Sequence, residues 1–191
     1  MRKALGRWLE QRNICNLRIK IESEVRCIGE PVTATDESHY PEILDAGSGK
    51  LGSWDYTKGV TKADLCYGND FNKPLVFMDN EFDLIVCSGV IQYLENLELF
   101  ITELKRILKP DGRIILATIN NDCWLRRIGL VKRALKKDEW QLFTEQSLEI
   151  FINKFGFKKE HSWGIDFVPL FPTGLCTNIG VILTNDRNNT V

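Results

Sequence analysis

From residue 42 onward the sequence alternates short apolar segments with longer amphipathic segments. The short segments are predicted to be strands at 43–44, 60–65, 82–87, 113–119, 157–165 and 178–184. The longer ones predict helices at 96–109, at about 122–137, and from Thr144 to near Gly156. Strands that alternate with helices indicate an α/β fold, in which a mostly parallel sheet is covered by helices on both faces.

Polar residues fall at or just after the ends of several predicted strands. Asp45, Asp64, Asp70 and Ser88 all have such positions. In a sheet of this kind ligands bind beyond the carboxyl ends of the strands, near the point where the strand order reverses. We therefore expect these four residues to line one crevice.

A glycine-rich turn follows the first predicted strand. Gly47 and Gly49 lack a Cβ, so the backbone can turn sharply and a ligand can lie against bare main chain. With Gly52 they also match the pattern G-x-G-x-x-G, and Asp64 follows Gly47 by 17 residues. That arrangement would suit a nicotinamide dinucleotide.

The residues after the turn argue against a dinucleotide. A dinucleotide loop should open a helix whose N-terminus faces the pyrophosphate. Residues 53–59 read Ser-Trp-Asp-Tyr-Thr-Lys-Gly, which is short and poor material for that helix. A ligand without a pyrophosphate would not require it.

The composition excludes several other classes of protein. A chain of 191 residues suits one domain with some extra covering, and a net charge of −1 does not point to nucleic acid. The six cysteines include no C-x-x-C pair, so neither a metal site nor a disulfide framework is expected. No apolar run approaches the roughly 18 residues of a membrane helix. The protein is expected to be soluble and cytoplasmic.

Three parts of the chain are distinguished by composition. Residues 1–40 are expected to form a helical extension and a linker, although Leu17, Ile19 and Ile21 also fit strand alternation. Residues 41–185 carry the α/β pattern. The polar residues 186–191 are expected to be a disordered tail.

Several sequence blocks together resemble the class I S-adenosylmethionine-dependent methyltransferases, and most closely the methyltransferase type 11 group. The blocks are Ile-Leu-Asp-Ala-Gly-Ser-Gly at 43–49, the stretch 70–94, Leu-Lys-Arg-Ile-Leu-Lys-Pro-Asp-Gly-Arg-Ile-Ile-Leu at 104–116, and looser matches at 140–148 and 155–157. Their order and spacing carry the resemblance, which covers roughly two-thirds of the chain. It implies a Rossmann-like fold with an antiparallel last strand, and S-adenosylmethionine as the cofactor.

The resemblance also implies roles for particular residues. Backbone from Ala46 through Gly47 and Ser48 to Gly49 would hold the methionine part of the cofactor, and Asp45 would orient its amino group. The two carboxylate oxygens of Asp64, beside Leu65, would accept hydrogen bonds from both ribose hydroxyls.

The other end of the cofactor would meet the second block. Asp70 would accept a hydrogen bond from the adenine amino group, with the Phe71 backbone beside the ring. Ser88 and Gly89 would lie near the sulfonium. Because the cofactor supplies the electrophile, the protein mainly aligns the two reactants, and often no strong base is needed.

The chain departs from the family pattern in two places. Only five residues separate Asp64 from Asp70, so the helix between the second and third strands is predicted to be missing and the edge strand absent or vestigial. Where many relatives have Glu-His, this chain has Gln92-Tyr93, which excludes a histidine base there. Tyr93 is the candidate catalytic or substrate-contacting residue, and plain packing is equally compatible with its position.

The methyl acceptor is expected to be a small molecule. The predicted helix at 124–137 combines an apolar stripe with arginines and lysines, which fits either a solvated face or a lid that attracts an anionic acceptor. A nucleic-acid acceptor is disfavoured because no RNA-binding module accompanies the basic residues. The alternative to an enzyme is a non-catalytic S-adenosylmethionine-binding partner or regulatory protein of the same fold.

Overall fold

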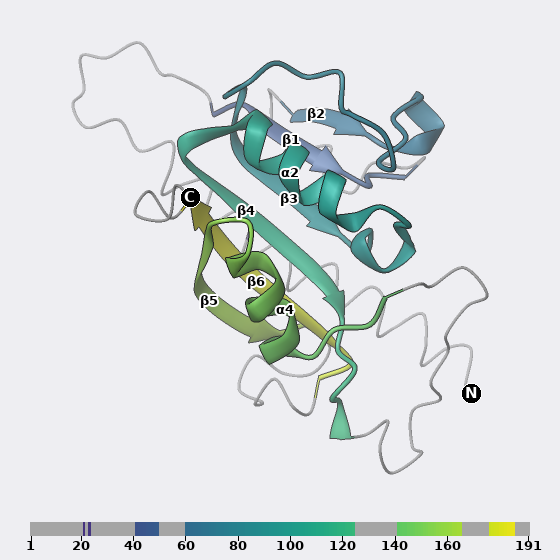
Figure 1. Ribbon diagram of the computed structural model, residues 1–191, viewed down its shortest axis with the longest axis vertical. Coiled ribbons are helices and arrows are strands. Elements are labelled where there is room, and N and C mark those ends of the chain that lie inside the picture. Colours follow the sequence, from purple (N-terminus) through teal and green to yellow (C-terminus); the bar gives the residue numbers. More distant parts are fainter. Residues whose placement is uncertain are drawn as a thin grey trace.

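The computed structural model describes residues 21, 23, 41–49, 60–124, 141–165 and 176–185. These residues form a six-stranded sheet in the order β2-β1-β3-β4-β6-β5 (Figure 1). The strands are β1 (Ile43–Ala46), β2 (Val60–Ala63), β3 (Phe82–Ser88), β4 (Leu108–Ile119), β5 (Phe157–Gly164) and β6 (Asn178–Asn185).

The directions of the strands match the expected fold class. β1 is parallel to β2 and β3, and β3 is parallel to β4. β6 is antiparallel to both of its neighbours, β4 and β5. The mostly parallel sheet with an antiparallel last strand is therefore confirmed.

Two of the predicted helices begin with side-chain caps. In α2 (Leu97–Ile107) the side chain of Asn96 accepts a hydrogen bond from the backbone N–H of Leu99 at 3.2 Å. In α4 (Glu145–Asn153) Thr144 and Ser147 form a reciprocal capping box. Each cap satisfies backbone donors that the first helical turn leaves without an intrahelical partner.

The sheet is covered on both faces. α2 and α4 lie over the same face (Figure 1), and Phe100 and Ile152 of these helices belong to its buried core. On the opposite face Ile21, which has helical backbone, packs in a second core with Leu84 and Ile115. The sheet is thus the middle layer, as continuous apolar strands require.

The segment from β2 to β3 contains neither an α-helix nor a strand. All of residues 64–81 are described, and among them only η1 (Leu65–Tyr67) is regular, as one 3-10 turn. β2 is consequently the edge strand of the described sheet. This agrees with the short spacing between Asp64 and Asp70 in the sequence.

Some boundaries differ from expectation. β4 begins at Leu108 rather than near 113, because Leu108 pairs with Phe82 before the register shifts. β2 ends at Ala63, because Asp64 caps the turn of η1 with its side chain. Both differences arise from local pairing and capping that hydrophobic periodicity does not encode.

Several expected features lie outside the described residues. They are most of the 1–40 extension, the short helix after Gly52, the basic helix beyond Trp124 and the tail at 186–191. Trp124 itself has helical backbone and is 52% exposed.

Candidate active site

A pocket of about 330 Å³ lies at the carboxyl ends of β1, β2 and β3. Its walls come from three separate parts of the chain. The lining residues are Gly47, Asp64, Leu65, Asn69, Asp70, Phe71, Asn72, Gly89, Val90, Tyr93 and Leu94. The strand ends thus converge on one crevice, where a parallel sheet is expected to place its ligand.

The glycine turn needs its glycines. Gly47 has a φ of +91°, and a Cβ there would lie 2.1 Å from Cγ2 of Val90. Its N–H donates to the carbonyl of Ala63 at 2.7 Å, which ties the turn to the end of β2. Gly89 also has a positive φ, of +70°, and donates its N–H to Ala117. Backbone, not side chain, therefore forms these parts of the wall.

Asp64 joins two parts of the pocket. One carboxylate oxygen accepts from the N–H of Gly49 at 3.2 Å, and the other accepts from the N–H of Cys66 at 3.0 Å. The bond from Cys66 is the main reason why the pKa of Asp64 lies below its ordinary value, although partial burial opposes the shift. The Cys66 side chain adds a further hydrogen bond to this carboxylate. Two carboxylate oxygens offer about four acceptor sites, so the group can still accept from a ligand.

Asp70 begins a tight turn at the opposite wall. Its carboxylate accepts from the N–H of Asn72 at 3.1 Å and pairs with Lys73 at 3.1 Å. The Asn72 bond, and then Lys73, lower the pKa of Asp70. Next to it the ring of Phe71 packs against Phe100, with ring centroids 5.0 Å apart, so the Phe71 side chain belongs to the core.

Five of the predicted site residues are not among those that line the pocket. Asp45 and Ala46 are buried in β1, and Ser48 is 6% exposed in the turn. The Ser48 hydroxyl makes no hydrogen bond within the part of the chain that the structure describes. The other two are Gly49, which is joined to Asp64, and Ser88, the last residue of β3.

Gln92 and Tyr93 point in different directions. Both belong to η2 (Ile91–Tyr93). Gln92 is buried, and its amide oxygen accepts from the hydroxyl of Thr118 at 3.3 Å. Tyr93 is 37% exposed and lines the pocket. Tyr93 is thus placed where it could contact a ligand, and Gln92 supports the wall from behind.

Four lining residues were not singled out from the sequence: Asn69, Asn72, Val90 and Leu94. For Asn72 a local signal exists, because it lies two residues after Asp70 in the spacing of an Asx turn. Val90 packs over Gly47, a contact that only the tertiary structure reveals.

A second cavity of about 330 Å³ lies between β4, α4 and β5. Lys159 in its wall pairs with Glu145 at 3.2 Å and with Glu149 at 2.5 Å. Burial alone would lower the pKa of Lys159, but the two carboxylates outweigh it and the pKa is raised. The cation is thus already neutralised by protein groups.

The described residues contain no group of three or more His, Cys, Asp or Glu side chains placed to hold a metal ion. None of the helices they form is both long and apolar enough to cross a membrane.

Part of the chain matches a known protein family. Residues 44–116, which include the glycine turn and every described residue of the pocket wall, match the family model of the methyltransferase domain. The six-stranded fold is also found in solved S-adenosylmethionine-dependent methyltransferases, and both findings are consistent with a class I methyltransferase that uses S-adenosylmethionine.

Curated relatives match only in part. An uncharacterized protein from Methanocaldococcus jannaschii is 33% identical over 89 residues, which are 45% of this chain and 43% of the relative. A ubiquinone biosynthesis O-methyltransferase from Rickettsia bellii is 32% identical over 122 residues, with 50% of this chain and 51% of the relative covered. The chain thus spans about half the length of these relatives or less.

Solved structures share the fold at low sequence identity. An S-adenosylmethionine-dependent methyltransferase from Thermotoga maritima superposes with a TM-score of 0.59 at 15% identity, covering 96% of this chain and 95% of that one. The 1,6-didemethyltoxoflavin-N1-methyltransferase from Burkholderia thailandensis was solved with 1,6-didemethyltoxoflavin and S-adenosylhomocysteine bound. It superposes with a TM-score of 0.54 at 15% identity, covering 75% of this chain and 70% of that one.

Proposed function

We propose that this chain is a methyltransferase that binds S-adenosylmethionine in the pocket between the glycine turn and Asp70, and transfers its methyl group to a small-molecule acceptor. The observation that carries the proposal is that one pocket collects Gly47, Asp64 and Asp70 from three separate segments. Its volume of about 330 Å³ falls in the range of small-molecule sites.

The polar groups of the pocket suit the parts of the cofactor. The carboxylate of Asp64 lines the pocket with two acceptor oxygens, which fits two adjacent ribose hydroxyls. Asp70 fits the adenine amino group. Bare backbone at Gly47 and Gly89 leaves room for the methionine part and the sulfonium.

The chemistry needs alignment more than a base. The cofactor supplies an electrophilic methyl group, which an acceptor lone pair displaces from the sulfonium in one step. The residues of this chain would hold the two reactants in line and exclude water. Tyr93 would contact the acceptor at the pocket wall. The acceptor could be anionic, because basic residues at 126–137 follow Trp124 in the sequence.

The proposal is tested by calorimetric titration with S-adenosylhomocysteine, with NAD as the comparison ligand. Binding of S-adenosylhomocysteine alone is expected, and Asp64→Asn should weaken it. If millimolar S-adenosylhomocysteine gave no heat and no thermal stabilisation, the proposal would be abandoned. A mass-spectrometric screen of acceptors with S-adenosylmethionine then tests transfer.

A second candidate is a non-catalytic S-adenosylmethionine-binding protein. The observations in its favour are the short segment 64–81 and the Gln92-Tyr93 pair, since His161, the one histidine among the described residues, does not line the pocket. Tight S-adenosylhomocysteine binding without turnover in a broad acceptor screen would favour this candidate.

A further inference from the structure

The short segment that replaces a helix and a strand is fastened along α2. At the start of the segment the side-chain oxygen of Asn72 accepts from the N–H groups of Glu95 and Asn96, at 2.9 and 3.0 Å. Near its end Asn80 donates its N–H to the carbonyl of Arg106 at 3.0 Å. The segment therefore runs from the N-terminal to the C-terminal end of α2.

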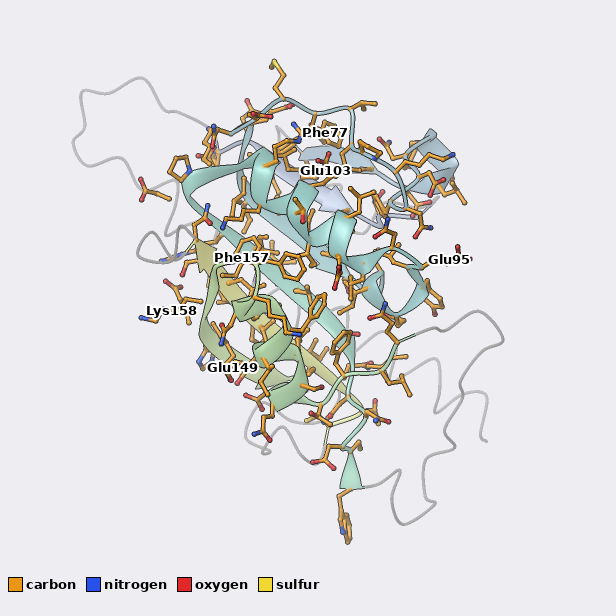
Figure 2. The ribbon with its side chains drawn as sticks, in the orientation of Figure 1. Phe77, Glu95, Glu103, Glu149, Phe157 and Lys158 are labelled. Atoms are coloured by element: carbon orange, nitrogen blue, oxygen red, sulfur yellow. The ribbon has the colours of Figure 1, made fainter. Side chains whose placement is uncertain are left out.

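Between these points Glu103 and Arg106 form a clamp. The carboxylate of Glu103 accepts from the N–H of Leu75 at 2.8 Å. The guanidinium of Arg106 donates to the carbonyls of Leu75 and Phe77 at 3.0 and 2.8 Å, and pairs with Asp79 at 2.7 Å. Figure 2 shows Glu103 and Phe77 together at one end of α2 and Glu95 at the other.

The clamp is internally paired. Nη2 of Arg106 lies 2.7 Å from Oε2 of Glu103, and Glu103 is only 8% exposed. The hydrogen bond from Arg106 holds the pKa of Glu103 below its ordinary value in spite of burial. A buried carboxylate of this kind is tolerated because it is both paired and hydrogen-bonded.

The clamped segment continues directly into the pocket wall. Asn72 lines the pocket and is joined to Asp70 by the side-chain bond of the tight turn. Lys73 donates its N–H to the Asp70 carbonyl at 3.0 Å, and Leu75, two residues on, is buried. With no α-helix or strand in residues 64–81 to fix this wall, side-chain bonds to its backbone set its position.

We propose that Glu103 and Arg106 are positioning residues for the cofactor pocket: they fix segment 72–79 on α2 and so hold Asp70 and Asn72 where they meet the adenosine part of the ligand. The inference rests on the proposed function. It assigns to the clamp an effect on ligand affinity, beyond its effect on stability.

The test uses Arg106→Lys. The lysine ammonium keeps the positive charge, but it cannot hydrogen-bond at once to the two carbonyls and the two carboxylates that the planar Arg106 guanidinium contacts. The matched control is Lys109→Met. Lys109 pairs with Asp83 at 2.7 Å and is 30% exposed, as Arg106 is, but it lies at the start of β4, away from the pocket.

Each protein is titrated with S-adenosylhomocysteine and with S-inosylhomocysteine, well below its unfolding midpoint. Arg106→Lys is expected to raise the Kd for S-adenosylhomocysteine by about tenfold, and to reduce the preference over the inosine analogue, which lacks the amino group that Asp70 would recognise. Lys109→Met should lower the unfolding midpoint and leave both Kd values within about twofold.

The outcomes separate the two proposals. A wild-type protein that binds neither ligand would overturn the proposed function and this inference with it. Wild-type binding with an unchanged Kd and preference in Arg106→Lys would overturn the inference alone and leave the clamp a purely structural device. If Arg106→Lys does not fold, Glu103→Gln, which keeps an acceptor for Leu75, is judged by the same two readouts.

Discussion

The carboxylate of Asp64 accepts a hydrogen bond from the backbone N–H of Gly49, 15 residues earlier in the chain, at 3.2 Å. The same carboxylate accepts from Cys66 through its other oxygen. One side chain thus joins the glycine turn after β1 to the turn after β2. The pocket and the local fold depend on the same charged group.

The first prediction is that Asp64→Asn weakens S-adenosylhomocysteine binding by about tenfold or more. An amide offers one acceptor atom where the carboxylate offers two, and its NH₂ group would face an N–H donor. Hydrogen bonds to a charged group contribute about 1.5–3 kcal/mol each. Calorimetric titration measures the change. Asp111→Asn, at an exposed position of β4 that does not line the pocket, is the control and should leave the Kd unaltered.

The second prediction concerns acid. The pKa of Asp64 is held below its ordinary value of 3.8, mainly by the N–H of Cys66. A carboxyl with a depressed folded-state pKa stabilises the protein above its unfolded pKa, and this contribution is lost as the pH falls through the folded one. The difference in unfolding free energy between wild type and Asp64→Asn should be constant near neutral pH and shrink below 3.8.

Urea unfolding at a series of pH values provides the measurement. A free-energy difference that instead shrinks as the pH rises from 5 to 7 would contradict the assignment, because it would require a raised pKa of Asp64 in the folded state.

The third prediction compares two glycines of the same turn. Gly47 and Gly49 both have positive φ, +91° and +63°, but only a Cβ at Gly47 meets a neighbour, Cγ2 of Val90 at 2.1 Å. Gly49→Ala should cost about 1 kcal/mol from backbone conformation alone. Gly47→Ala should cost about 2–4 kcal/mol, because overpacking adds to the strain.

Val90→Ala separates the two contributions. In the Gly47→Ala background, Val90→Ala should restore the unfolding free energy lost to overpacking, while the loss from the backbone conformation remains. Combined with Gly49→Ala, the effect of Val90→Ala on the unfolding free energy should simply add. Denaturant unfolding of the single and double variants gives the free energies for this double-mutant cycle. Additive behaviour of Gly47→Ala with Val90→Ala would show that the predicted contact does not limit stability.

Much of the fold could be predicted because local patterns decide it. The apolar faces of α2 and α4 predict both helices from the sequence, and Thr144 marks the start of the second one. The short spacing from Asp64 to Asp70 predicted the missing helix. Of the four polar strand-end residues expected in one crevice, Asp64 and Asp70 line the pocket, whereas Asp45 and Ser88 are not among its lining residues.

The rest depends on contacts between distant residues. Nothing in the neighbourhood of Arg106 indicates that its guanidinium reaches Leu75 and Phe77, roughly thirty positions earlier. The packing of Val90 over Gly47 is likewise a contact between residues distant in the sequence. Hydrophobic periodicity gives the face of an element and is silent on the partner that a polar side chain will find across the fold.

The last prediction addresses Tyr93. It lines the pocket and is 37% exposed, so its hydroxyl can reach an acceptor without being needed for the core. With an acceptor identified in the screen, Tyr93→Phe should lower kcat/KM by about tenfold and leave the Kd for S-adenosylhomocysteine within about twofold, because the proposed role of the hydroxyl is to contact the acceptor. Tyr67→Phe is the control: Tyr67 is 48% exposed in η1 and does not line the pocket, so both constants should be preserved. A Tyr93→Phe protein with wild-type kcat/KM would instead assign Tyr93 to packing at the pocket wall.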